Sequence, residues 1–235
     1  MEEPSTASGS TEGTSLVNGI AQHVTEEGQP NGEGSDAQPQ SSSDSTKPLR
    51  VLRHLEGVCV APGTTATFSA AVSGPSDEVI WMKNGKEVRS EGRINISQRD
   101  GEHILEIADA SPEDHGIYQL EVRHNDKRVL SVASLVVLER PNEPRVARLP
   151  QSANASVSSP CKFVLELENA ENLTVQWFKG SEKVEKSDRV KSVKSGNAFK
   201  LDFKSVEVSD EGVYVVKVIK DKKAICKFAA ALHVE

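Results

Sequence analysis

Three cysteines and six histidines are the residues of this 235-residue chain most able to act as nucleophiles or metal ligands. Such chemistry needs close groupings, for example CxxC, HExxH or GxSxG, and the sequence contains none of these motifs. The one suggestive pair is Asp114-His115. On a strand or a tight turn adjacent side chains point apart, so this pair cannot form a proton relay by itself. The sequence therefore predicts no catalytic, metal or cofactor site and argues against an enzyme.

The cysteines, Cys59, Cys161 and Cys226, are odd in number, which does not suit a disulfide framework. The first residues, MEEPSTASGS, do not resemble a signal peptide, and the longest apolar run, residues 132–138, is too short to cross a bilayer. We therefore expect a cytoplasmic chain with no membrane partner. For Cys161 and Cys226 two interpretations stay open, namely two buried small hydrophobic residues or an unconventional bridge or redox switch.

Charge is unevenly distributed along the chain, whose formal net charge is −7. Residues 1–48 hold eight acidic groups and one lysine, so residues 49–235 are neutral. Nucleic-acid binding requires an excess of Lys and Arg, and it is not expected here. Residues 1–48 also lack aromatic residues and are rich in Ser, Thr, Gly, Glu, Gln and Pro. Such a segment cannot bury enough apolar surface to fold, and it is predicted to be a disordered acidic tail.

From residue 49 onward, short alternating apolar runs are separated by turn signals such as Asn84-Gly85, a pattern typical of β-strands. Four motifs recur at a constant offset of 96 residues: Val79-x-Trp81 with Val175-x-Trp177, Arg93 with Arg189, Leu105-x-Ile107 with Leu201-x-Phe203, and Asp114-x-Gly116-x-Tyr118 with Asp210-x-Gly212-x-Tyr214. The sequence thus predicts an all-β chain with two tandem immunoglobulin-like sandwiches, at residues 49–140 and 141–235, after the tail.

These motifs resemble the intermediate-type (I-set) immunoglobulin repeat of intracellular muscle proteins, the titin, twitchin, myosin-binding and obscurin group, with short members of the disorganized-muscle-protein type among them. The resemblance covers residues 50–235. It implies that the tryptophans are core anchors, that the tyrosines form tyrosine corners, and that each Asp pairs with an Arg. The core residues would be Trp81, Tyr118, Trp177 and Tyr214, and the structural ion pairs Arg93 with Asp114 and Arg189 with Asp210.

The chain departs from the extracellular immunoglobulin pattern where an inter-sheet disulfide would lie. Apolar residues fill the four half-cystine positions, Ala70 and Leu120 in the first repeat and Leu165 and Val216 in the second. Neither repeat can form that bridge, which agrees with a reducing compartment. Between the repeats, Pro141 and Pro144 restrict the backbone and predict a semi-rigid joint with the two domains end to end.

The two repeats differ in charge, with a net charge of −3 for residues 49–140 and +3 for residues 141–235. Part of the positive excess lies on one predicted hairpin and consists of Lys220, Lys222, Lys223 and Lys227. Solvated turn lysines that protect a sheet edge are the ordinary explanation. The alternative is a docking site for an acidic filament.

Together these observations predict a non-enzymatic, cytoplasmic structural or scaffold protein that binds other proteins through tandem immunoglobulin domains. The resemblance implies a place in the muscle sarcomere or the actomyosin cytoskeleton, with actin, myosin or other filament components as partners and no small-molecule substrate. The alternative is a cell-surface or secreted recognition and adhesion module. The lack of a signal peptide and of the inter-sheet disulfides argues against that alternative.

Overall fold

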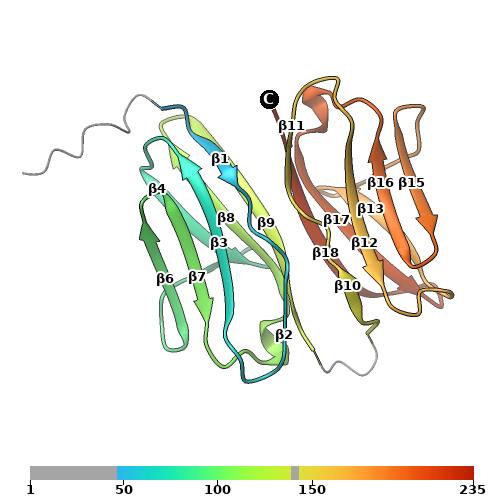
Figure 1. Ribbon diagram of the computed structural model, residues 1–235, viewed down its shortest axis with the longest axis horizontal. Helices are drawn as coiled ribbons and strands as arrows, with labels where there is room; N and C mark the ends of the chain where they lie inside the picture. The colour runs from blue at the N-terminus through green and yellow to red at the C-terminus, as the bar shows by residue number, and fades with distance from the viewer. Residues whose placement is uncertain (1–46, 139–142) are drawn as a thin grey trace, which may run out of the picture. The chain divides into compact units, whose positions relative to one another are not determined.

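The computed structural model describes residues 47–138 and 143–235 (Figure 1). The predicted disordered tail, residues 1–48, lies almost entirely outside these residues. The described chain consists of β-strands and loops with two short 3-10 helices, η1 (Pro112–Asp114) and η2 (Val208–Asp210). The predicted all-β fold class, with two immunoglobulin-like sandwiches, is confirmed.

The first repeat is a sandwich of a four-stranded and a five-stranded sheet. The strand orders are β1-β3-β7-β6 and β2-β9-β8-β4-β5. All neighbours are antiparallel except β2 and β9, which run parallel. The strands are β1 (Arg50–Arg53), β2 (Val58–Val60), β3 (Ala66–Ser73), β4 (Glu78–Lys83), β5 (Lys86–Val88), β6 (Ile94–Arg99), β7 (Glu102–Ile107), β8 (Gly116–His124) and β9 (Lys127–Val137).

The second repeat has the same topology, with strand orders β10-β12-β16-β15 and β11-β18-β17-β13-β14. Here β11 and β18 form the parallel pair. The strands are β10 (Val146–Arg148), β11 (Ala153–Ala155), β12 (Cys161–Leu167), β13 (Thr174–Lys179), β14 (Glu182–Lys183), β15 (Val190–Ser195), β16 (Ala198–Phe203), β17 (Gly212–Lys220) and β18 (Lys223–Val234). The constant sequence offset therefore corresponds to one topology repeated along the chain.

Each sandwich has its own core, which follows from the alternation of side chains along its strands. In β16, Phe199, Leu201 and Phe203 are buried while the residues between them are only half-buried. Successive side chains of a strand point to opposite faces, so one side chain in two enters the space between the sheets. Trp81 and Trp177, each 2% exposed, lie in separate core clusters.

Strands β9 and β18 depart from this alternation, because residues 131–137 of β9 and 228–232 of β18 are buried without a break. The outer faces of these strands must therefore be covered as well. Both repeats belong to one compact unit of the chain, and Val132 of β9 packs against Ala229 and Ala231 of β18. The prediction that the domains lie end to end is wrong. Prolines restrict the dihedral angles of a joint, whereas burial of apolar outer faces favours packing of the two sheets.

The four positions of the missing inter-sheet disulfides are buried in the cores, at Ala70, Leu120, Leu165 and Val216. The three cysteines are all reduced. Cys161 on β12 and Cys226 on β18 come from opposite sheets, and both pack against the second core. Burial raises the pKa of the Cys161 thiol, which lowers its thiolate fraction at neutral pH. These two residues act as small hydrophobic residues in this structure.

Candidate functional site

In the first repeat, the Asp, Arg and Tyr of the motifs that recur 96 residues later meet at the turn before β8. Arg93 forms a two-pronged ion pair with Asp114, with Nη1–Oδ2 at 2.6 Å and Nη2–Oδ1 at 2.8 Å. The Tyr118 hydroxyl donates to the carbonyl of Asp114 at 2.9 Å. Burial alone would raise the pKa of Asp114, but the bonds from Arg93 and from the Ser111 N–H hold it below its usual value. The carboxylate is therefore kept ionised and fully occupied.

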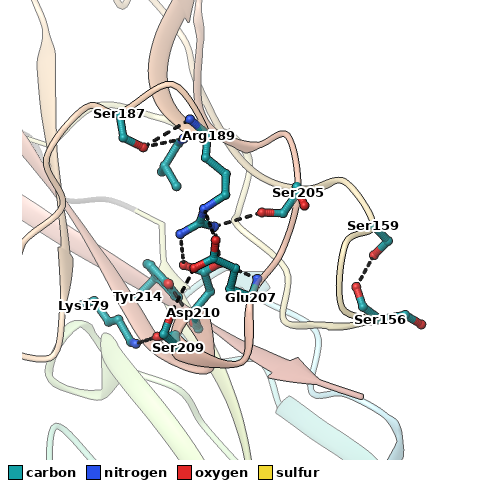
Figure 2. Close-up of polar contacts among 11 residues, drawn as sticks. Ser156, Ser159, Lys179, Ser187, Arg189, Ser205, Glu207, Ser209, Asp210 and Tyr214 are labelled. Atoms are coloured by element: carbon teal, nitrogen blue, oxygen red, sulfur yellow. Dashed lines mark hydrogen bonds and ion pairs between the residues drawn. The ribbon is translucent and has the colours of Figure 1, made fainter.

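The second repeat has the matching arrangement, shown in Figure 2. Arg189 again pairs with both carboxylate oxygens of Asp210, and its Nε also lies 3.1 Å from Glu207 Oε1. The Tyr214 hydroxyl donates to the Asp210 carbonyl at 2.7 Å. Burial raises the pKa of Tyr214, as it does for Tyr118, so neither hydroxyl is available as a base. Each cluster holds in place the turn before β8 or β17. We therefore assign a structural role to both.

The neighbouring His115 does not join Asp114 in a relay. Its Nε2 lies 3.9 Å from Glu143, and its ring lies edge-on to Phe228 with a centroid distance of 6.4 Å. The Asp114 carboxylate is directed to Arg93 instead. Within residues 47–138 and 143–235, no group of three or more His, Cys, Asp or Glu side chains could hold a metal ion. In the same residues, no helix is long and apolar enough to cross a membrane.

The hairpin of β17 and β18, here named the second F–G hairpin, holds the candidate partner-binding lysines. Its register places Lys220 opposite Lys223, and Lys217 opposite Lys227. Like charges directly opposite each other on neighbouring strands repel. Among the described residues, no carboxylate forms an ion pair with any of these side chains or with Lys222. Lys220 and Lys223 nevertheless line a groove that also contains Glu143, Glu168 and Asp221.

The turn of this hairpin is also strained. Asp221 and Lys222 have φ angles of 49° and 65°, in the left-handed region. A two-residue hairpin turn of this kind favours Asn-Gly, because a side chain at positive φ clashes with the backbone. Lysine at this position costs about 1 kcal/mol relative to glycine. The hairpin thus combines unpaired positive charges with an unfavourable turn residue.

In the first F–G hairpin, formed by β8 and β9, Arg123 and His124 of β8 have carboxylate partners, while Lys127 and Arg128 of β9 form no ion pair with another described residue. Arg123 lies 2.9 Å from Glu78 and 2.5 Å from Glu121. His124 lies 3.0 Å from Asp77, which also accepts a 2.8 Å bond from the Asn125 N–H. The Asn125 N–H and His124 lower the pKa of Asp77. The two hairpins therefore differ on their first strand: β8 carries cations with carboxylate partners, whereas Lys217 and Lys220 of β17 have no such partner among the described residues.

Sequence reasoning missed Lys217, whose ammonium lies 4.1 Å from the centroid of the Phe178 ring. Together with Lys227 it extends the basic surface from the turn onto the outer face of the sheet. A cation placed over an aromatic ring is stabilised but keeps its charge. The signal was hidden because it depends on the register of β17 against β18 and β13, which the sequence alone does not specify.

Comparison with known proteins identifies the repeats. The family model for the immunoglobulin I-set domain matches residues 49–137 and again residues 144–234. The chain belongs to the I-set immunoglobulin family. The resemblance to muscle-type I-set repeats is thereby confirmed, while the domain limits at residues 48 and 140 stay a prediction.

The relatives include named muscle proteins. The muscle M-line assembly protein unc-89 of Caenorhabditis elegans is 30% identical over 177 residues, which is 74% of this chain and 2% of that protein. Fast-type myosin-binding protein C of Mus musculus is 30% identical over 172 residues, 71% of this chain and 14% of that protein. A solved chimeric titin Z1Z2 tandem is 25% identical, with coverage of 80% and 100% and a TM-score of 0.40. The chain thus spans only a small part of these curated relatives.

Proposed function

We propose that this chain is a non-enzymatic structural protein of the cytoplasm that binds filament proteins of the sarcomere or of the actomyosin cytoskeleton. Its I-set repeats support a protein-binding role, and its relatives are named for muscle assembly and for myosin binding. The described residues offer no cluster of metal-ligating side chains. The polar clusters at Asp114 and Asp210 are occupied by scaffold contacts.

The second F–G hairpin carries the proposal. Lys220, Lys222, Lys223 and Lys227 have no ion-pair partner among the described residues, and Lys222 lies at an unfavourable positive φ. Neither feature stabilises the fold. An acidic filament surface would supply the missing carboxylates, so actin is the first partner to test and the myosin rod the second. The contact would be solvent-exposed, and its strength should fall as salt screens the charges.

Co-sedimentation of the full chain with actin filaments, and separately with myosin rods, tests the proposal. Changing Lys220, Lys222 and Lys223 together to Glu should abolish salt-sensitive binding. A matched control places the same charge reversal on exposed cations of the first repeat, Lys86, Lys127 and Arg128. The control should bind as the unmodified chain does, because its changes lie outside the second hairpin.

Both variants should keep their melting temperatures, since surface substitutions usually change the free energy of unfolding by no more than about 0.5 kcal/mol. Equal loss of binding in both variants would show that binding depends on the net charge of the chain and not on the second F–G hairpin. Unmodified chain that sediments with neither filament would refute the proposed partners.

A further inference from the structure

The outer faces of β9 and β18 form a third apolar cluster that belongs to neither sandwich core. Val132, Ala229 and Ala231 are 0%, 0% and 3% exposed. Three half-buried side chains pack against them: Ile117, Val213 and Val215. In a lone sandwich these outward side chains would meet water. Their burial therefore depends on closure of one repeat against the other.

Serine hydroxyls connect the two strands across this contact. The Ala229 N–H donates to Ser134 Oγ at 3.1 Å. The Ser152 hydroxyl accepts from the Ala231 N–H at 2.7 Å and donates to the Val132 carbonyl at 2.6 Å. The Ala229 N–H and the Val132 carbonyl are thus satisfied by side chains of the opposite repeat.

A chain of hydrogen bonds centred on His54 lies beside this contact. Asn154 Nδ2 donates to the Val51 carbonyl at 2.8 Å, which directs Asn154 Oδ1 toward His54 Nε2 at 2.7 Å. The Leu55 N–H donates to Ser131 Oγ at 2.8 Å, and the Ser131 hydroxyl proton is then available to His54 Nδ1 at 3.0 Å. In this pattern the imidazole is neutral, with its proton on Nε2.

We propose that His54 is a latch between the repeats, which close side by side while it is neutral and open when it is protonated. A protonated imidazole has a proton on both nitrogens and cannot accept from Ser131. The strands packed against His54 present Ser131 from β9, Asn154 from β11 and His233 from β18. His233 in turn lies 3.2 Å from Glu211.

The electrostatics agree with this direction. Burial lowers the pKa of His54, the bond to Asn154 opposes that effect, and the nearby His233 lowers the pKa further. The closed form therefore binds fewer protons than the open form. Closure is strongest above the ordinary histidine pKa of about 6.5 and weakens as the pH falls below it.

Hydrogen exchange of the Ala229 amide in the full chain tests the latch, because that N–H donates to Ser134 of the other repeat. Its protection, relative to the intrinsic exchange rate, should be high at about pH 7.5 and should fall at about pH 5.5, by up to the tenfold that one histidine with an open-form pKa of about 6.5 allows. In His54→Gln, an amide N–H can still donate to Asn154 and does not titrate, so protection should be equal at the two pH values. His124→Gln, a matched change on the first F–G hairpin, should keep the pH response.

An Ala229 amide that exchanges freely at the higher pH would overturn the closed arrangement. A pH response that persists in His54→Gln would overturn the role of His54. Should His54→Gln fail to close, Asn154→Asp supplies a second test. A carboxylate beside His54 favours the protonated imidazole, so the response to acid must shrink in that variant, and an unchanged response would refute the latch.

Discussion

The F–G hairpins of the two repeats join corresponding strands and differ in their charges. In the first hairpin, carboxylates stand beside Arg123 and His124. At the positions 96 residues later the second repeat has apolar, neutral or basic residues, with Leu173 for Asp77, Thr174 for Glu78 and Lys217 for Glu121. Thr174 and Lys217 lie outside the core clusters, whereas Leu173 is 5% exposed and belongs to the second core. Charge on this hairpin is thus free to serve binding.

The largest effect on stability is expected for the buried tryptophan of each sandwich core, a feature that the two repeats share. Trp81→Ala and Trp177→Ala each remove a buried indole and leave a cavity, which should lower the free energy of unfolding of the mutated repeat by about 3–5 kcal/mol. Denaturant titration of each variant would measure that free energy, and amide spectra would show which repeat is affected. The other repeat should keep its dispersion, with shifts confined to β9 and β18. Collapse of both repeats would show that the two cores are not independent.

A smaller effect is expected at the ion pair of the first repeat. Asp114→Asn should destabilise that repeat by about 2 kcal/mol at neutral pH, because Arg93 and the Ser111 N–H lose a charged acceptor. The pKa of Asp114 is lowered on folding, so its contribution is present above about pH 4 and is lost as the pH falls further. Denaturation of both proteins at several pH values checks this. A difference that persists in strong acid would contradict the electrostatic explanation.

Transplanting charges between the hairpins would test the comparison directly. Thr174→Glu places at an exposed position of the second repeat the carboxylate that Glu78 supplies in the first. Salt-sensitive filament binding should weaken about tenfold, or about 1.4 kcal/mol, because the lysines acquire a partner within the chain. The control carries one carboxylate at an exposed position far from the hairpin, Ser156→Glu. Equal weakening in the control would mean that only net charge matters.

Relief of the strained turn should have a modest effect on stability. Lys222→Gly should stabilise the second repeat by about 1 kcal/mol, since glycine accepts a positive φ without steric cost. A thermal melt should rise by about 4–8 °C for a domain of this size. Asn125→Gly in the first hairpin should gain less, because asparagine tolerates this conformation. Equal gains in the two hairpins would remove the argument from strain.

The smallest effect should be that of a reducing agent. The melting temperature should be the same with and without dithiothreitol, because all three cysteines are reduced and apolar residues fill the inter-sheet positions. A fall of many degrees in the reductant would reveal a bridge between Cys161 and Cys226 or between molecules.

The amino-acid sequence alone was sufficient for the architecture. Alternating apolar runs, two tryptophans and two Asp-x-Gly-x-Tyr motifs at one offset predicted two sandwiches, because these features report local strand geometry and core position. The ion-pair partners of Arg93 and Arg189 could also be predicted, because the resemblance to a known repeat implied a pairing that sequence spacing alone does not give.

Only the tertiary structure decided which surfaces meet. Nothing in the sequence distinguishes the contact residues Val132, Ser134, Ala229 and Ala231 from other strand residues. Their burial depends on the packing of one sheet against another. The pairing of Arg123 with Glu78 likewise depends on the register of β4 against β8. Register and domain packing bring together residues 45 to 100 positions apart, and such contacts leave no local periodicity in the sequence. The bond between His54 and Asn154 could therefore be found only in the folded chain.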